Sequence, residues 1–421
     1  MRTLRPPGQS HLKFYLVWDE DCAVGVNHIS HGRGNQLMDE RKMANTLRES
    51  IHEDLDDPRT GNATSHPLEN IVFIALYGVV CGAQSWVGVE QFGYGKRKWL
   101  EQFLDLTAGI PSHDTFGRVF SILEPSELRR CFLRWSRALS RGSGGQIAID
   151  GKTLRRSFEA DDPQTALHTV GAWVNEQDIF LMGPATRTKD EIGASLELLE
   201  MLELEKTVVT FDALGCQRKI AKKLRSKGAD YLLRVRGNQG TLHQAIKEFF
   251  EWQLDEDLPA DQKMALEIVE DIDGGHGRIE ERRLWCTDEI DWLETERKWS
   301  GLSSIARLDS VRHVDGKIEQ MTRYYICSDA DASAEQILKW AREHWSIENK
   351  AHWVLDVQMR EDDSRIRKRH AAENMAAIRR MAMNLLKRDE KLSVGLKNKQ
   401  LRAACDHDYF MHLLSLVDEN L

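Results

Sequence analysis

Three short segments, spread over half of the chain, each end in an acidic residue that a folded protein would expose. They are residues 146–150, 207–212 and 344–348. Carboxylate oxygens are the ligands that Mg²⁺ prefers, and such ions keep open positions for water and phosphate. Two carboxylates that close apolar strands and a third on a helix are typical of a two-metal phosphoryl-transfer site. We therefore interpret Asp150, Asp212 and Glu348 as catalytic and metal-binding residues, with two Mg²⁺ or Mn²⁺ ions as cofactors.

The elements that must position these carboxylates follow a definite order within residues 143–392. The apolar pattern predicts three antiparallel strands, a helix, a strand, a second helix and a fifth strand. Their expected ranges are 147–150, 167–174, 178–186, 188–202, 207–211, 217–227 and 231–236. This is the order of an RNase H-like fold, an α/β fold with a mixed sheet. Because that fold places its first and fourth strands side by side, we expect Asp150 and Asp212 to meet.

Local signals refine these elements. Thr188 and Glu191 are spaced as a capping box at the start of the first helix, and Gly228 is expected to end the second. Residues 240–330 then interrupt the pattern. They contain four further alternating segments, which we interpret as a β-rich insertion; the ranges are 266–272, 278–285, 304–312 and 321–327.

A long helix is expected to follow the insertion and to carry the third carboxylate. Ser333 and Gln336 form its predicted capping box. One stripe of this helix contains Ile337, Ala341, His344, Glu348 and His352. Helical spacing therefore predicts that Glu348 faces the sheet.

The rest of the chain divides by composition. Residues 1–62 are interpreted as a polar N-terminal extension, 63–142 as a small all-helical domain and 393–421 as a C-terminal tail. The apolar run 71–89 is interpreted as a buried helix; a membrane span is supported by its length alone. Ser112 is expected to cap a helix after the break at 109–111. This outline fits a DNA-binding helix-turn-helix, and it fits two packed core helices equally well.

Charge is distributed in blocks that the net charge of −9 conceals. Residues 129–158 contain eight basic and one acidic residue, 218–247 nine and one, and 360–402 thirteen and six, whereas 251–296 contain sixteen acidic and four basic residues. Basic blocks beside each carboxylate segment favour a site that holds a polyanion, although solvated helix faces have the same composition. The seven scattered cysteines include no Cys-x-x-Cys pair and indicate a reducing, cytoplasmic setting.

Six motifs, specific in combination, carry a resemblance that covers about His66 to Leu386. They are His66-Pro67-Leu68, residues 110–116, residues 149–152, Gly237-Asn238-Gln239, residues 276–280, and residues 344–349 continuing through 352–357. On these motifs the chain resembles the DDE transposases of bacterial insertion sequences, in their H-repeat-associated branch. The resemblance implies that Asp150, Asp212 and Glu348 bind the metal ions. It also implies that the protein cuts the ends of an element and transfers the 3′-OH strand to target DNA.

The implied partners are the terminal inverted repeats of an element and target DNA, with a homodimer when two ends are synapsed and no membrane. Bound to DNA, the protein would be associated with the nucleoid. Residues assigned to DNA contacts are Lys152, Arg155, Arg156, Arg236, Asn238, Gln239, His276, Arg278, Arg282, His344, Asn349, His352, Arg365 and Lys368. Lys152, Arg155 and Arg156 are included because a loop beside the metal ions must meet DNA.

Two features leave alternatives open. Many related transposases surround the glutamate with a tyrosine, an arginine and a lysine, and this chain has Ala341, His344 and Leu355 there. Glu361 and Asp362 compete with Glu348 for the role of third carboxylate. The competing functions are an RNase H-like nuclease that does not join strands and a domesticated DNA-binding protein that no longer cuts.

Overall fold

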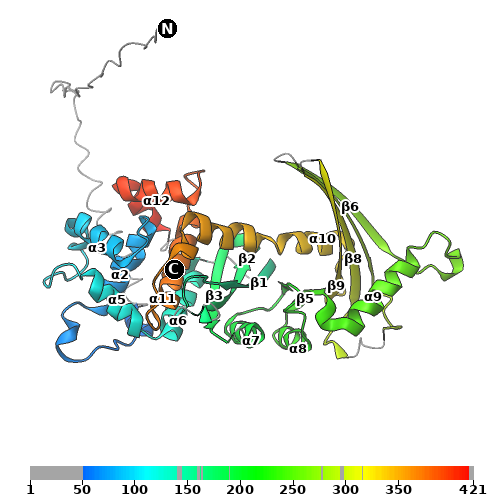
Figure 1. Ribbon diagram of the computed structural model, residues 1–421, viewed down its shortest axis with the longest axis horizontal. Coiled ribbons are helices and arrows are strands. Elements are labelled where there is room, and N and C mark those ends of the chain that lie inside the picture. Colours follow the sequence, from blue (N-terminus) through cyan, green and yellow to red (C-terminus); the bar gives the residue numbers. More distant parts are fainter. Residues whose placement is uncertain are drawn as a thin grey trace, which may run out of the picture. The chain divides into compact units, whose positions relative to one another are not determined.

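Among the described residues, nine strands form one mixed sheet (Figure 1). The computed structural model describes residues 51–139, 145–158, 162, 165–188, 190–275, 278–293, 298–314 and 316–416. The order across the sheet is β3-β2-β1-β4-β5-β9-β8-β7-β6. The strands are β1 Gly145–Thr153, β2 His168–Val174, β3 Ile179–Thr186, β4 Thr207–Phe211, β5 Asp230–Val235, β6 Glu267–Gly275, β7 Arg278–Thr287, β8 Ser304–Val314 and β9 Lys317–Cys327.

The central pairing agrees with the prediction that the first and fourth strands are neighbours. β1 is antiparallel to β2 and parallel to β4, and β4 is parallel to β5. Ile149 of β1 lies opposite Phe211 of β4. Since the two strands run in the same direction, Asp150 and Asp212 follow at the same end of the sheet.

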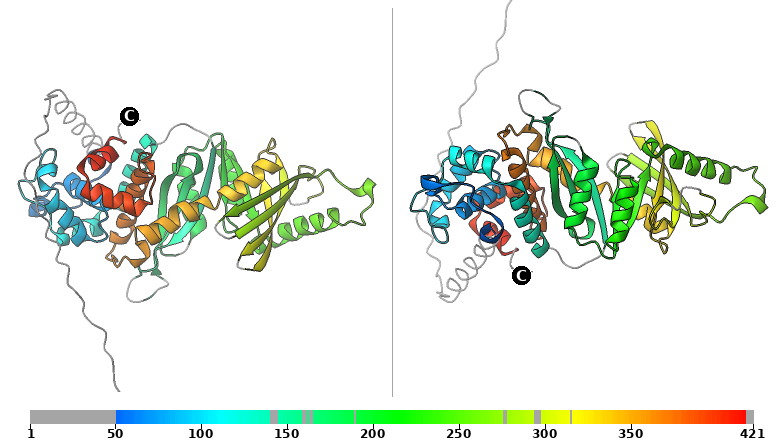
Figure 2. Two further views of the ribbon diagram at one scale, coloured as in Figure 1. Left: turned by 90° about the horizontal axis from the view of Figure 1, so that it is seen from above. Right: turned by 90° about the horizontal axis from the view of Figure 1, so that it is seen from below.

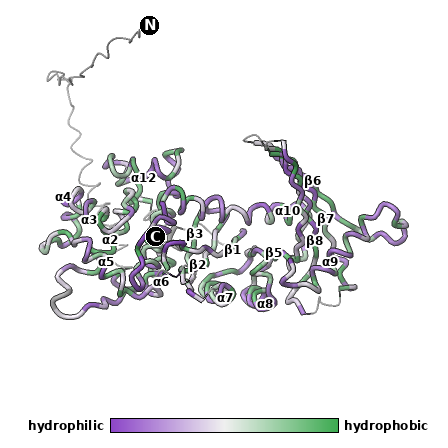
Figure 3. Tube along the Cα trace, viewed as in Figure 1, coloured by the Kyte–Doolittle hydropathy of each residue, from purple (hydrophilic) through white to green (hydrophobic). Residues whose placement is uncertain are grey.

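The predicted β-rich insertion extends this sheet. β9 pairs antiparallel with β5, with Leu232 opposite Cys327, and β8, β7 and β6 continue outward as antiparallel neighbours. Hydrophilic residues run along much of β6, as the purple tube in Figure 3 shows. The chain is thus a mixed α/β protein, as predicted.

Helices cover both faces of the sheet (Figure 2). Seen from below, α7 Glu191–Met201 and α8 Arg218–Ser226 cross one face, and α9 Gly240–Gln253 packs on the same core. Seen from above, α10 Ala334–Glu343 crosses the opposite face. The alternation of β5 explains the two layers, because Leu233 belongs to the core under α7 and α8 whereas Leu232 packs with α10.

Two helix starts were predicted from capping boxes, and one prediction was wrong. Ser333 and Gln336 do form the capping box of α10. At α7, however, the N-cap is Asp190, whose carboxylate accepts from the amide of Gly193. Thr188 instead contacts Thr186 through its hydroxyl and its amide. Gly228, with φ +71°, follows α8 as expected.

After α10 the chain continues in wider helical turns. Two π-helical segments, η7 Ile347–His352 and η8 Val354–Gln358, are followed by the short 3-10 helix η9 Glu361–Asp363. π-Helical turns are rare and often mark functional sites. This segment carries Glu348, so the predicted stripe is not that of a uniform α-helix.

A second group of helices combines the two ends of the described chain. Its members are α2 Leu68–Val80, α3 Trp86–Gly95, α4 Arg97–Leu100, α5 His113–Ile122, α6 Pro125–Leu139, α11 Ala371–Arg388, α12 Leu396–Cys405 and α13 His407–Ser415. Short 3-10 turns are η1 Gly61–Thr64, η3 Asn175–Gln177, η4 Gly237–Gln239 and η5 Ala260–Gln262. Ile51 and Leu55, in the expected extension, are buried in the same core. The expected C-terminal tail also packs there, where Gln400 donates to the carbonyl of Val79 at 2.9 Å.

The apolar run 71–89 does not form one helix. α2 ends at Val80, Gly82 has φ +92°, and the side chain of Ser85 caps α3 by accepting from the amide of Gly88. Ser112 caps α5 as predicted. Across the described residues, no helix has both the length and the apolar character required to cross a membrane.

Candidate active site

The three carboxylates predicted from the sequence line one pocket. Asp150 lies on β1, Asp212 follows β4, and Glu348 lies in η7; all three border a cavity of about 110 Å³. Parallel pairing of β1 with β4 brings the aspartates together, and the helix that crosses the sheet supplies the glutamate.

Asp150 is held in an environment that resists a negative charge. Burial raises the pKa of its carboxyl from 3.8 to about 6, and nearby Asp212 and Glu191 add to the increase while His352 opposes it. Asp212 is fixed by its own loop, since its Oδ1 accepts from the amide of Leu214 at 2.9 Å. Carboxylates held close in this way repel one another unless a cation or proton lies among them.

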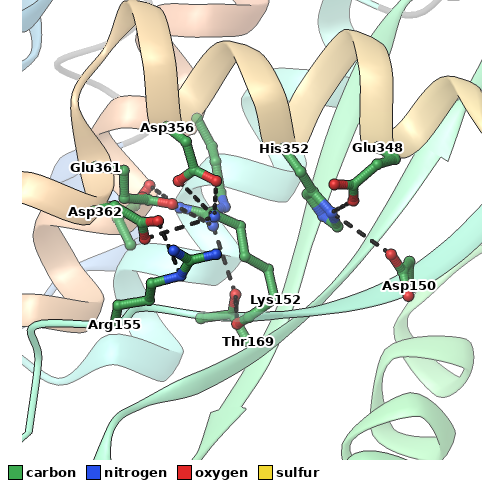
Figure 4. A network of polar contacts seen from close by, with 11 residues as sticks. Asp150, Lys152, Arg155, Thr169, Glu348, His352, Asp356, Glu361 and Asp362 are labelled. Carbon is green, nitrogen blue, oxygen red and sulfur yellow. Dashed lines mark hydrogen bonds and ion pairs between the residues drawn. The ribbon is translucent and has the colours of Figure 1, made fainter.

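The side chain of His352 lies between those of Glu348 and Asp150 (Figure 4). The Nδ1 atom of His352 lies 3.0 Å from Glu348 Oε2 and 3.5 Å from Asp150 Oδ2. This hydrogen bond lowers the pKa of Glu348. The glutamate side chain is 54% exposed and the histidine 5%, so Glu348 borders the pocket and His352 supports it from inside. Helical spacing predicted that Glu348 faces the sheet. Glu348 does border the pocket at the sheet, although its side chain is more exposed than that prediction implied.

These groups fit a divalent cation. One ligand atom from each of Asp150, Glu348 and His352 lies within 4.8 Å of the others. Burial, with smaller contributions from Asp212 and Glu191, raises the pKa of Asp150, and a bound cation would offset this cost of the charged carboxylate.

His344, predicted to contact DNA, is part of the pocket wall. Its Nδ1 lies 3.0 Å from the hydroxyl of Thr210, and Gln146 donates to that hydroxyl and to the carbonyl of Trp340. Burial lowers the pKa of His344 to about 4, with smaller contributions from Arg234 and His352. At neutral pH His344 is therefore an uncharged group that ties α10 to β4.

Lys152 was expected in an exposed loop, and the structure corrects this. Its side chain is only 7% exposed, and its Nζ lies 2.5 and 2.6 Å from the carboxylate oxygens of Asp356 in η8 (Figure 4). An ammonium group in such a pair is not free to contact phosphate. Lys152 instead joins the strand of Asp150 to the helical segment of Glu348.

Asn238 and Gln239 also have structural partners. The side-chain amide of Asn238 donates to the carbonyl of Ala213 at 2.6 Å. The side-chain amide of Gln239 donates to the carbonyl of Cys216 at 3.0 Å. Both contacts hold the loop that begins at Asp212. Arg236, just before them, is exposed.

Arg282, a predicted DNA contact in the insertion, is already paired with acidic residues. Arg282 is 10% exposed and forms ion pairs with Asp271 and Glu280, each at 2.9 Å. Its guanidinium is therefore already neutralised by neighbours on β6 and β7. His276 lies outside the described residues, as does the side chain of Arg278.

The competing third carboxylates have other partners. Glu361 is 1% exposed and accepts from the guanidinium of Arg380 at 2.7 and 3.2 Å. Asp362 lies 3.2 Å from Arg155 Nε and 3.9 Å from Lys152 Nζ. Neither residue lines the pocket of Asp150, whereas Glu348 does.

The remaining predicted DNA contacts are exposed. Arg155, Arg156, Asn349, Arg365 and Lys368 all have exposed side chains. Arg156 lies 3.8 Å from Asp363, and Arg155 is the partner of Asp362.

Sequence reasoning missed Arg234. It lies on β5 opposite Tyr325 and lines the pocket, and its Nε is buried without a hydrogen-bond partner among the described residues. The available signal was a charged residue within the otherwise apolar strand 231–235.

Comparison with known proteins identifies the family of the chain. Residues 180–385 match the family model described as "Transposase DDE domain", and residues 51–136 match "DDE_Tnp_1-associated". Asp212 and Glu348 fall inside the first match, and Asp150 precedes it. A "Putative transposase YncI" of Escherichia coli O157:H7 is 36% identical over 371 residues, which cover 87% of this chain and 93% of the relative.

A second relative covers a similar length. The "H repeat-associated putative transposase YhhI" of Escherichia coli K12 is 36% identical over 367 residues, covering 86% of this chain and 96% of that protein. With its carboxylate pocket, its helical N-terminal region and these relatives, the chain belongs to the H-repeat-associated branch of the DDE transposases.

Proposed function

We propose that the protein is an active transposase with an RNase H-like catalytic fold, which cuts element ends and transfers the 3′-OH strand to target DNA. The observation that carries this proposal is the meeting of Asp150, Asp212 and Glu348 in one pocket from three distant segments. The strand order 3-2-1-4-5, with β1 parallel to β4, supports the fold assignment. The first step is hydrolysis at an element end, and the second is attack of the freed 3′-OH on target DNA.

The carboxylates of Asp150, Asp212 and Glu348 would hold two Mg²⁺ or Mn²⁺ ions. When bound, such ions would neutralise the negative charge of the phosphate oxygens and increase the acidity of an attacking oxygen. The chain's own residues orient the site. His352 holds Glu348 beside Asp150, Lys152 ties the two segments together, and Asn238 fixes the loop of Asp212.

Arg234 is the cation best placed to face a phosphate at this pocket. It is the arginine that lines the cavity, and its unsatisfied Nε leaves hydrogen-bonding capacity for an anion. Synapsis of two element ends would require a second copy of the chain. Such chemistry would take place on DNA in the cytoplasm.

Strand cleavage by purified protein on supercoiled plasmid, with Mg²⁺ or Mn²⁺, tests the proposal. Asp150→Asn, Asp212→Asn and Glu348→Gln should each abolish nicking, whereas Glu319→Gln, on the exposed end of β9, should not. Retained cleavage in all three pocket variants would refute the assignment.

A joining assay separates a transposase from a nuclease of the same fold. A duplex with free 3′-OH ends is incubated with the protein and target plasmid. Covalently joined products are expected from a transposase. Cleavage without any joined product would favour the nuclease.

A further inference from the structure

We propose that a groove between the helical region and the chain that follows η9 binds the backbone of duplex DNA. The inference rests on the proposed function, since it supplies a DNA-binding surface for the same reaction. One wall is formed by residues 84–87 and part of α5, and the other by residues 363–368 and Ala371. The groove encloses about 920 Å³.

Exposed cations line the groove. Arg118, Arg365 and Lys368 line the groove with exposed side chains, and no acidic partner of theirs is found in the part of the chain that the structure describes. Arg360, in contrast, is paired with Asp363 at 2.9 Å. Guanidinium and ammonium groups left free along one surface provide the charge that a phosphate backbone requires.

The acidic residues of the groove do not cancel this charge. Asp363 already accepts from Arg360 and lies 3.8 Å from Arg156. Asp114 lies 3.7 Å from His113, and its side chain is 93% exposed to solvent. The groove therefore keeps a positive balance suited to an anion.

The direction of three helices adds to the positive potential. Trp86, His113 and Ala371, the first residues of α3, α5 and α11, all line the groove. The amino end of a helix carries a partial positive charge and free amide donors, and phosphate oxygens are favoured there. α11 has no side-chain cap at His370, and the amide of Ala371 donates to the carbonyl of Lys368 at 2.9 Å.

α5 presents a polar face to the groove. His113, Asp114, Gly117 and Arg118 line it, whereas Phe116 and Val119 are fully buried behind them. Trp86 stacks on Phe120 at 4.7 Å between ring centroids, so this indole is occupied by the core. A duplex held through its phosphates fits this surface better than an unpaired base, which would need a free aromatic face.

The groove is connected by the chain to both halves of the active site. The wall at 363–368 follows the segment of Glu348, and Nε of Arg367 donates to the carbonyl of Arg156 at 2.8 Å, six residues after Asp150. DNA bound in the groove is therefore held by segments continuous with those that carry the carboxylates.

The test is the salt dependence of duplex binding by the full chain. Fluorescence anisotropy with a labelled random-sequence duplex is measured for wild type and for Arg118→Gln/Arg365→Gln/Lys368→Gln. The control triple variant Lys263→Gln/Lys298→Gln/Lys317→Gln removes the same charge from exposed positions in the insertion, outside the basic blocks.

We expect the groove variant to bind about 10- to 1000-fold more weakly at low salt. Its plot of log K against log salt should flatten by about 0.9 for each phosphate that the protein no longer neutralises. The affinity of the control should fall much less. Wild-type affinity and slope in the groove variant, or an equal fall in the control, would overturn the proposal.

The experiment also separates this inference from the proposed function. Mg²⁺ affinity of the groove variant, measured by calorimetry, should equal that of wild type because none of its three residues lines the carboxylate pocket. If the groove variant binds DNA normally while Asp150→Asn abolishes cleavage, the groove assignment fails and the catalytic assignment stands.

Discussion

The Nδ1 atom of His352 lies 3.0 Å from Oε2 of Glu348, four residues earlier in the same π-helical segment. The same nitrogen lies 3.5 Å from Asp150 Oδ2. An imidazole therefore stands between two of the three carboxylates proposed to bind cations. It either supports them by hydrogen bonding or contributes a nitrogen ligand.

Replacing His352 with glutamine distinguishes these roles. Imidazole nitrogen favours transition metals, whereas Mg²⁺ prefers oxygen. If His352 is a ligand, His352→Gln lowers Co²⁺ affinity roughly 10- to 100-fold and Mg²⁺ affinity much less. Calorimetry measures both, and the visible spectrum of bound Co²⁺ should change. His313→Gln, on β8, is the control, and equal losses for both ions would leave His352 only a supporting role.

Cation binding should depend on pH through Asp150. A cation needs the charged carboxylate, and the pKa of Asp150 is raised from 3.8 to about 6 by burial and by Asp212 and Glu191. Mg²⁺ affinity is therefore expected to rise as the pH increases through about 6 and to level off above it. Calorimetry between pH 5 and 8 measures this. An affinity already constant from pH 5 would contradict the prediction.

The same shift predicts a stability change of defined sign. A carboxyl whose pKa is raised in the folded state contributes stability at low pH, and this is lost as the pH rises from about 4 to about 6. Without added cations, Asp150→Asn should therefore stabilise the protein at pH 8 by about 1–3 kcal/mol relative to its effect at low pH. Urea unfolding at both pH values tests this, with Asp331→Asn as an exposed control.

Strand order was predictable because apolar alternation and strand length are local properties. Residues 207–211 form β4 over the predicted range, and the pairing of β1 with β4 follows from the fold that this order indicates. What could not be read was the interruption of 71–89, since hydropathy does not show the positive φ of Gly82. The π-helical turns of η7 were not predicted for a related reason, because residues 337–352 were assumed to have α-helical spacing.

Long-range partners account for the errors within the site. The sequence predicts an exposed cation at Lys152, beside Asp150. In the structure its side chain is buried and paired with Asp356, 204 residues away. Asn238 reads as a polar loop residue, yet its partner is a main-chain carbonyl at Ala213, which has no sequence signature. The carboxylates themselves were identifiable because their chemistry and the order of their elements constrain each other.

Lys152 should contribute to stability and to the geometry of the site. Lys152→Met leaves the carboxylate of Asp356, which is 27% exposed, without its cation, so we expect a loss of about 1–3 kcal/mol. Adding Asp356→Asn should recover part of it. Arg155→Met, at a side chain that is 78% exposed, should change stability by less than about 0.5 kcal/mol. Urea unfolding measures all four proteins, and an equal cost for Lys152→Met and Arg155→Met would contradict a special role of the buried pair.

Glu361 provides the sharpest test of which glutamate is the third carboxylate. Burial alone would raise its pKa, but the guanidinium groups of Arg380 and Arg379 lower it, so this buried glutamate is charged at neutral pH. Glu361→Gln leaves Arg380, which is 0% exposed, without a counter-charge and should cost about 3 kcal/mol, and Glu361→Leu/Arg380→Met should recover much of that loss. In the Glu361→Gln protein that remains folded, Mg²⁺ affinity should be unchanged.

Glu348→Gln should show the opposite pattern. Its loss of stability should be small because the Glu348 side chain is 54% exposed, whereas its Mg²⁺ affinity should fall by about 10-fold or more. If folded Glu361→Gln loses Mg²⁺ and Glu348→Gln keeps it, the third carboxylate is Glu361, and the π-helical segment has another role.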